Sequence, residues 1–160
     1  MIETGARNTW NARLEMQAPA EDVLAVLTDP EHCGRWSPID FEVEELQGRR
    51  LVAGSRARVT GKLAGARASF DVEVFEGGPD RLVLRASGPL VLDVDYRLAP
   101  VGGGSTDVTA SVTVARGRGL VGRVLEPATK ALLAGGALHS AVARIANAVE
   151  ARREAPALAA

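Results

Sequence analysis

The feature that most constrains the fold is a series of short segments between residues 40 and 115, separated by turn-forming residues. The breaks fall at Gly48, Gly54, Gly65, Gly77-Gly78-Pro79, Gly88-Pro89 and Gly102-Gly103-Gly104. Closely spaced segments with glycine-rich turns predict antiparallel strands. Parallel strands need long crossover connections, and none fits between these breaks, so a parallel sheet is excluded. We predict strands near 40–48, 54–63, 66–76, 80–87, 90–99 and 105–115.

Polar and apolar residues alternate within these predicted strands. In the segment 66–76, Phe70 and Val72 point to one face of the sheet, while Asp71 and Glu73 point to the other. The same alternation gives the other segments a dry face, with Val59, Leu84, Tyr96, Leu98 and Val112 among its members. An antiparallel sheet with one apolar face must cover that face with another element.

The segment before these strands predicts one more strand and a short helical region. Residues 9 to 17 alternate and therefore predict a seventh strand. Pro19 suits the first turn of a helix, where the helix dipole favours the carboxylates of Glu21 and Asp22. Asp29-Pro30 ends that helix, because the residue before a proline is disfavoured in a helical conformation. Residues 31–36 predict one further short helical turn.

The last segment supplies the cover for the dry face. Apolar or small residues recur every three or four positions at Val121, Val124, Ala128, Ala131, Gly135, Leu138, Val142, Ile145 and Val149. This spacing predicts one long amphipathic helix over residues 120–152, with a kink or its true start at Pro127. The pair Gly135-Gly136 either opens space for a ligand or allows close packing against Phe70 or Tyr96. We expect residues 154–160 to form a loose tail.

This order of elements resembles the helix-grip fold of the START-related superfamily that includes polyketide cyclases and dehydratases. The local sequence agrees at residues 18–38, Ala53-Gly54-Ser55-Arg56, Tyr96-Arg97-Leu98-Ala99-Pro100 and Gly104-Ser105-Thr106-Asp107-Val108-Thr109. The resemblance spans about residues 8 to 152. It implies an α+β fold, in which a curved antiparallel sheet of about seven strands wraps a long C-terminal helix, with two short helices after the first strand. The domain would cover residues 1–153, with a flexible tail at 154–160.

The resemblance also implies a cavity between the sheet and the helix. Members of the superfamily often bind lipids, sterols, polyketides or other hydrophobic molecules there, and some cyclise or dehydrate polyketides. Because this fold hosts many unrelated functions, the resemblance alone does not identify a reaction.

Composition argues against several classes of function. The 19 basic and 20 acidic residues give a net charge of −1, and each basic cluster is short, so we do not expect nucleic-acid binding. Cys33 is the only cysteine, which excludes an intrachain disulfide and favours a reducing compartment. We find neither a signal-peptide core in residues 1–10 nor an apolar run that spans a membrane, and we expect a cytoplasmic protein. His32 and His139 are too far apart for a metal motif, so we expect neither metal nor cofactor.

The dry face predicts an apolar ligand. It is almost wholly aliphatic and includes small residues that leave volume, namely Ala12, Ala57, Gly61, Ala68, Ala86 and Ala110. The candidate ligand-binding residues are Trp36, Val59, Phe70, Leu84, Tyr96, Val112, Gly135, Leu138 and His139. For Trp36 two interpretations stay open, since its ring either stacks on the ligand at the mouth of the pocket or caps the core.

Few residues are suited to catalysis. His139 is one position off the helical stripe, so it is either a general base facing the cavity or a border histidine with its edge in water. Tyr96, the only tyrosine, either orients a ligand carbonyl or bonds a backbone group. Glu45 shares the alternation of Val43 and is a further inward candidate. Cys33 is either a small buried apolar residue or a nucleophile.

Charged residues on the predicted strands superficially resemble an acid–base set. They are Asp71, Glu73, Asp93, Asp95 and Arg97. Alternation places all of them on the solvent face, where we expect them to form cross-strand ion pairs.

Three hypotheses about function follow. The first is a protein that binds a hydrophobic or amphipathic small molecule, lipid-like or polyketide-like, between the sheet and the C-terminal helix. The second is a polyketide cyclase, aromatase or dehydratase in which His139 is the base and Tyr96 orients the substrate. The third is a partner-binding domain with a filled core. The sequence leaves open which ligand binds, whether a reaction is catalysed and how the chain assembles.

Overall fold

The computed structural model describes residues 8–29, 41–46, 52–63, 66–115 and 119–159. Its elements in chain order are β1 (Thr9–Met16), α2 (Ala20–Leu27), β2 (Phe41–Leu46), β3 (Arg56–Leu63), β4 (Ala66–Gly77), β5 (Arg81–Ser87), β6 (Val91–Val101), β7 (Ser105–Ala115), α4 (Gly119–Ala134) and α5 (Ala137–Ala159). The strands lie close to their predicted ranges. The second short helix, predicted at residues 31–36, lies outside the described residues.

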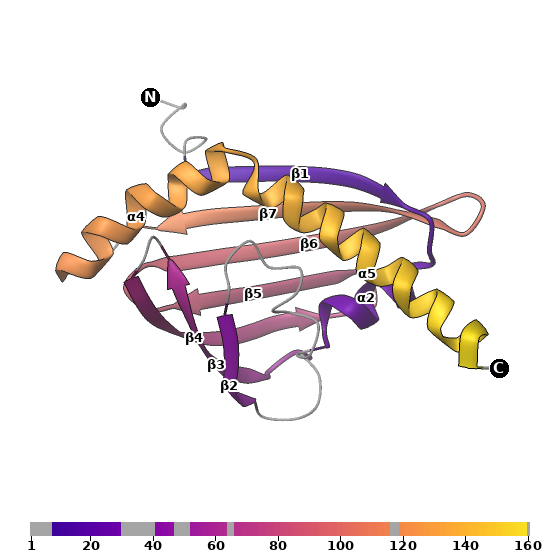
Figure 1. The fold of residues 1–160 in the computed structure, drawn as a ribbon, viewed down its shortest axis with the longest axis horizontal. Coiled ribbons are helices and arrows are strands. Elements are labelled where there is room, and N and C mark those ends of the chain that lie inside the picture. Colours follow the sequence, from indigo (N-terminus) through magenta and orange to yellow (C-terminus); the bar gives the residue numbers. More distant parts are fainter. Residues whose placement is uncertain (1–7, 30–40, 47–51, 64–65, 116–118, 160) are drawn as a thin grey trace.

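All seven strands belong to one antiparallel sheet in the order β1-β7-β6-β5-β4-β3-β2. The first strand therefore pairs with the last, while the others follow as a meander. Figure 1 shows the sheet as a curved layer with α5 running diagonally across one face. We call this the concave face. The arrangement confirms the predicted α+β helix-grip fold.

The two C-terminal helices lie over different parts of the sheet. Helix α5 contacts β1, β7 and α2, whereas α4 contacts α5 and β3. Strand β3 is far from β1 in the order of the sheet, so the curvature of the sheet is what brings β3 to α4. The helices thus close over the concave face from both sides.

The prediction of one continuous C-terminal helix is wrong. The axes of α4 and α5 are bent by 63° at the break between Ala134 and Ala137. Gly136 has a φ of +93°, a left-handed conformation that ends a helix and that glycine adopts without a steric penalty. Pro127 lies inside α4 and neither starts nor ends it.

The predicted stripe is correct on α5 and wrong on α4. Leu138, Val142, Ile145 and Val149 are buried, as expected. On α4 the buried residues are Gly122, Leu125, Thr129 and Leu133, whereas the predicted stripe residues Val121, Val124, Ala131 and Gly135 are exposed. The break at Gly136 lets α4 rotate relative to α5, so a single stripe cannot serve both helices. Helix α5 also continues to Ala159, through most of the segment predicted as a tail.

None of the described helices has by itself the length and hydropathy needed to cross a bilayer. Only the bent pair α4 and α5 meets that requirement, and only when the two helices are taken together.

Candidate functional site

The strand register aligns inward-facing side chains in rows across the concave face. One row passes from Trp10 on β1 through Val112 and Val94 to Leu84 on β5. The neighbouring row passes from Ala12 through Ala110 and Tyr96 to Leu82. Two alanines therefore precede the one tyrosine in its row, and their small size leaves room for its ring.

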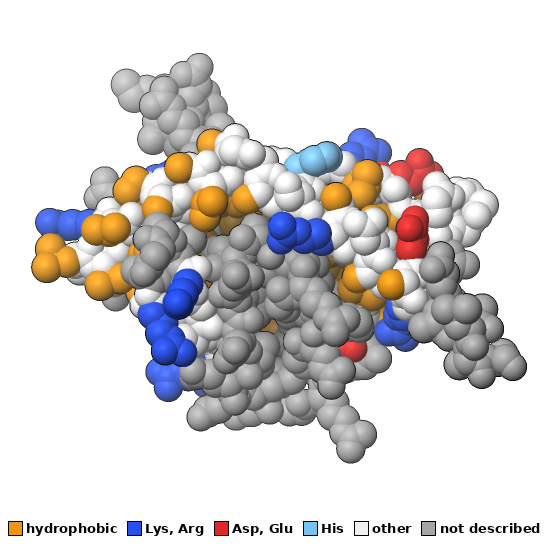
Figure 2. Space-filling view, viewed as in Figure 1, with side chains coloured by type: hydrophobic (Ala, Val, Ile, Leu, Met, Phe, Trp, Pro, Cys, Tyr) orange, Lys and Arg blue, Asp and Glu red, His pale blue; other side chains and the backbone are white. Residues whose placement is uncertain are grey.

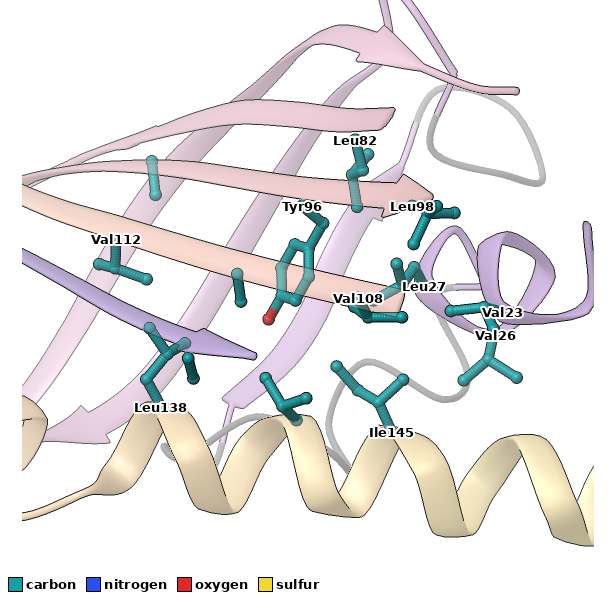
Figure 3. Packing of buried hydrophobic residues seen from close by; sticks show 14 of the residues in the cluster. Val23, Val26, Leu27, Leu82, Tyr96, Leu98, Val108, Val112, Leu138 and Ile145 are labelled. Carbon is teal, nitrogen blue, oxygen red and sulfur yellow. The ribbon is translucent and has the colours of Figure 1, made fainter. Parts of the chain in front are cut away.

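One end of the concave face is filled by protein. Figure 3 shows Val23, Val26 and Leu27 of α2 beside Leu98, Val108 and Ile145, which come from β6, β7 and α5. Each of these side chains is at most 4% exposed. This end of the sheet is a closed hydrophobic core and has no room for a ligand.

The rest of the concave face is covered unevenly, since Val72, Val74 and Ala86 are buried while other inward residues are not. Val59 on β3, Phe70 on β4, Leu84 on β5 and Val94 on β6 point inward and pack against the core, yet they remain half-buried. On β3, Val59 is flanked along the strand by two small residues of the same face, Ala57 and Gly61. Aliphatic and aromatic side chains that face inward without being closed off favour an apolar ligand. We call Val59, Phe70, Leu84 and Val94 the open patch.

Three of the predicted ligand-binding residues, Val59, Phe70 and Leu84, lie in the open patch. Val112 and Leu138 also face inward, but they are 9% and 4% exposed, and Figure 3 shows Leu138 of α5 pointing towards Val112. These two residues belong to the core, and they border the open patch through Val94, the partner of Val112.

Tyr96 lies at the boundary between the closed core and the open patch. Its side chain is 2% exposed, and in Figure 3 its hydroxyl points from the sheet towards α5. Among the described residues of the strands, it is the one ionisable side chain on the concave face. This position suits either of the roles predicted for it from the sequence.

Two predicted site residues lie off the concave face. His139 is exposed on α5, in agreement with the interpretation as a border histidine, because it is one position away from the buried Leu138. Gly135 is also exposed, and a Cβ added there would meet only the backbone of α4. The glycine pair therefore breaks the helix, and it neither packs against Phe70 or Tyr96 nor lines the open patch.

Three of the remaining candidate residues lie outside the described part of the chain, and a fourth lies beside a bulge that shifts the strand pairing. Trp36, Cys33 and His32 lie outside the described residues. A bulge between Val43 and Glu45 shifts the pairing, so that Glu45 is opposite Arg58 rather than in an inward row. The prediction for Glu45 assumed an unbroken alternation, which this bulge interrupts in the backbone pairing.

The charged residues of the strands pair on the outer face, as predicted. Arg85 donates to Asp93 with an Nε to Oδ1 distance of 2.6 Å, and Arg81 donates to Asp95 with an Nη2 to Oδ2 distance of 2.9 Å. The Nε of Arg97 lies 3.4 Å from the same Oδ2 of Asp95. The pairs of Arg81 and Arg85 tie β5 to β6 on the side away from the core, while the contact of Arg97 with Asp95 lies within β6.

Two of the outer carboxylates have lowered pKa values. For Asp95, partial burial by itself would raise the pKa, but the hydrogen bond and the charge of Arg81, helped by Arg97, outweigh burial and lower it. For Asp107, the hydrogen bond from Arg13 lowers the pKa, partly opposed by desolvation and reinforced by the positive charge of Arg13. Both groups are therefore held ionised by structural ion pairs and are not poised for acid–base chemistry.

One unusual polar group has no counterpart among the predicted site residues. Thr129 of α4 is 3% exposed, and its Oγ1 has no hydrogen-bond partner among the residues that the structure describes. It lies between Leu125 and Leu133 on the buried side of α4. A threonine outside the predicted stripe carries no signal of burial, which explains why sequence reasoning missed it.

The described part of the chain holds no cluster of side chains suited to a metal ion. No group of three or more His, Cys, Asp or Glu side chains able to hold one occurs among residues 8–29, 41–46, 52–63, 66–115 and 119–159.

The sheet that wraps a C-terminal helix, with an apolar face turned inward, defines the class of helix-grip proteins. Several solved structures share the fold of this chain. The protein TTHA0849 from Thermus thermophilus superposes with a TM-score of 0.68 at 19% identity, covering 90% of this chain and 98% of that protein. A START superfamily protein from Mycobacterium smegmatis superposes with a TM-score of 0.65 at 19% sequence identity. The match covers 89% of this chain and 97% of that protein. The protein DynU16 of the dynemicin biosynthetic locus superposes with a TM-score of 0.60 at 23% sequence identity. That match covers 89% of this chain and 47% of DynU16.

The chain belongs to the family described as polyketide cyclase / dehydrase and lipid transport, whose model matches residues 10–150. The match covers nearly all of the sheet, all of α4 and the first part of α5. No curated protein sequence matches the chain significantly.

Proposed function

We propose that this protein binds a hydrophobic or amphipathic small molecule, lipid-like or polyketide-like, against the open patch. The observation that carries this proposal is the uneven filling of the concave face. The end under α2 and the C-terminal part of α5 is closed, whereas Val59, Phe70, Leu84 and Val94 stay half-buried although they point inward. Membership of a family named for polyketide chemistry and lipid transport supports the same class of ligand.

The first experiment asks whether a ligand accompanies the protein. Native mass spectrometry of the purified protein, followed by organic extraction, should show a defined additional mass. A protein that carries no such mass, and whose melting temperature does not respond to fatty acids, sterols or aromatic polyketides, would instead have a filled core. That result would favour the partner-binding hypothesis.

A matched pair of variants on β5 locates the binding site. Leu84 and Val83 are adjacent, aliphatic and half-buried, but they point to opposite faces of the sheet. Leu84→Phe fills part of the open patch and should weaken ligand binding roughly tenfold. Val83→Phe adds a ring on the outer face and should leave affinity unchanged. Equal effects of the two substitutions would place the ligand elsewhere.

A second candidate function is catalysis on a polyketide-like substrate. It is favoured by one observation, the position of the Tyr96 phenol at the edge of the open patch. Because His139 is exposed on α5, the predicted pairing of these two residues in catalysis is not retained. Tyr96→Phe separates the two functions, since it should abolish turnover by an enzyme while changing the affinity of a binding protein only slightly.

A further inference from the structure

Helix α4 presents a second apolar face, which points away from the protein. Seven large hydrophobic residues are exposed in the described chain, and four of them are on α4. Leu120 is 80% exposed, Val124 62%, Val121 50% and Leu132 43%. At 3.6 residues per turn, these four positions fall within an arc of about 120°. We call these four residues the outer face of α4.

Packing within this protein does not explain why the residues of the outer face are apolar. The opposite side of α4 already packs through Leu125 and Leu133, so the helix is apolar on two sides. Isolated exposed apolar residues are ordinary, but a contiguous set on one helix marks an interaction surface. The charged residues of the helix, Arg123, Glu126 and Lys130, lie together on the remaining side of α4.

Two basic residues on the hairpin of β3 and β4 differ in their pairing from the arginines of β5. Arg81 and Arg85 make close ion pairs with aspartates of β6. In contrast, Lys62 and Arg67, both exposed, lie directly opposite each other on β3 and β4, and neither forms an ion pair within the described residues. Like charges placed directly across a strand pair repel each other. This cationic pair is on the hairpin whose first strand contacts α4.

Charge and apolar surface therefore occur at the same end of the molecule. Figure 2 shows hydrophobic side chains along α4, with Lys and Arg side chains just below them. In the same view the Asp and Glu side chains lie over the half of the molecule away from α4, where Lys and Arg side chains also occur. An apolar helix face flanked by basic residues matches a bilayer interface with anionic headgroups.

We infer that the outer face of α4, together with Lys62, Arg67 and Arg123, docks onto the surface of an anionic lipid bilayer. Leu120 and Val124 would enter the boundary between headgroups and acyl chains, while the cations would neutralise headgroup phosphates. A second copy of the chain fits this surface less well, because a two-fold contact would bring the same cations of both copies together. Docking in this manner would bring β3, which contacts α4 and carries Val59 of the open patch, close to the lipid. This surface goes beyond the proposed ligand binding.

Vesicle flotation of the full chain tests the inference. The protein should float with vesicles of phosphatidylcholine containing phosphatidylglycerol, and much less with pure phosphatidylcholine. Raising the salt concentration should release it, because salt screens the headgroup charges. Lys62→Gln/Arg67→Gln should weaken binding to the anionic vesicles by roughly tenfold. Leu120→Ser/Val124→Ser should weaken it at least as much.

Controls distinguish the outer face of α4 from general stickiness. Phe75→Ser and Val101→Ser remove apolar residues that are 48% and 38% exposed on other elements, and these variants should float like the unchanged protein. Three results would overturn the inference: no flotation with anionic vesicles, equal loss in the control variants, or a dimer that Leu120→Ser/Val124→Ser converts to a monomer. The assay needs no bound ligand, so its failure would leave the proposed ligand binding untouched.

Discussion

Two buried threonines differ in whether their hydroxyls find a partner. Thr106 donates to the carbonyl oxygen of Ala18 at 2.7 Å, whereas the hydroxyl of Thr129 finds no partner in the described part of the chain. Thr129→Val replaces an unsatisfied hydroxyl by a methyl group and should raise the free energy of unfolding by about 1 kcal/mol. Thr106→Val is the matched control, and it should lower that free energy by about 1 kcal/mol, because the Ala18 carbonyl loses its donor. Chemical denaturation measures both. A destabilised Thr129→Val variant would mean that the hydroxyl is satisfied in solution.

Residue positions within strands are predictable because the period of a strand is two. Parity alone places Val59, Phe70 and Leu84 on the inner face and Asp93 on the outer face, and the register confirms it. Parity assumes an unbroken strand pairing, which a bulge between Val43 and Glu45 interrupts. How deeply a side chain is buried could not be predicted, because burial depends on how far the curvature of the sheet brings β3 towards α4.

At the scale of elements, the C-terminal helices show why a periodic pattern can mislead. The segment 119–134 is apolar on two sides, so a spacing of three and four residues can be drawn through Val121 and Val124 or through Gly122 and Leu125. The sequence offers no reason to prefer either stripe. The glycine pair is visible in the sequence, but a glycine inside a helix costs only about 1 kcal/mol, so a break was not required.

The helix break itself can be tested at neighbouring glycines. Gly136 has a φ of +93°, which is unfavourable for a residue with a Cβ. The φ of Gly135 is not positive. Gly136→Ala should lower the free energy of unfolding by roughly 1 kcal/mol. Gly135→Ala, at an exposed position near the end of α4, should be nearly neutral. Thermal unfolding followed by circular dichroism compares the two. Equal effects would imply that α4 and α5 form one continuous helix in solution.

The outer face of the sheet predicts a response to acid. Because the pKa of Asp95 is lowered below its ordinary value of 3.8, its ionised form stabilises the fold above that pH. This stabilisation is lost as the pH falls below 3.8 towards the lowered pKa. Asp95→Asn should therefore reduce stability by about 1 kcal/mol at neutral pH, and the difference from the unchanged protein should shrink in acid. Denaturant titrations at several pH values give the comparison.

Asp71 provides the control for the acid response. It is 77% exposed and lies 3.7 Å from Arg58, so its ion pair is open to water. Asp71→Asn should change stability little at any pH. If Asp95→Asn behaved in the same way as Asp71→Asn, the ion pairs of Asp95 with Arg81 and Arg97 would not be formed in solution.

At the scale of the whole molecule, stability should follow the uneven filling of the concave face. Strands β6 and β7 lie inside the sheet and contribute Leu98 and Val108 to the closed core, while β3 lies near the sheet edge with half-buried inward residues. Native-state hydrogen exchange should therefore be slowest in β6 and β7 and faster in β3 and α4. A ligand that binds only the folded state adds to its stability, and it should slow exchange most where it makes contact. Slower exchange confined to β3, β4, β5 and α4 would locate the ligand at the open patch. If the ligand slowed exchange throughout the sheet, it would indicate only a global gain in stability. If the free protein were protected uniformly, the concave face would be filled from end to end.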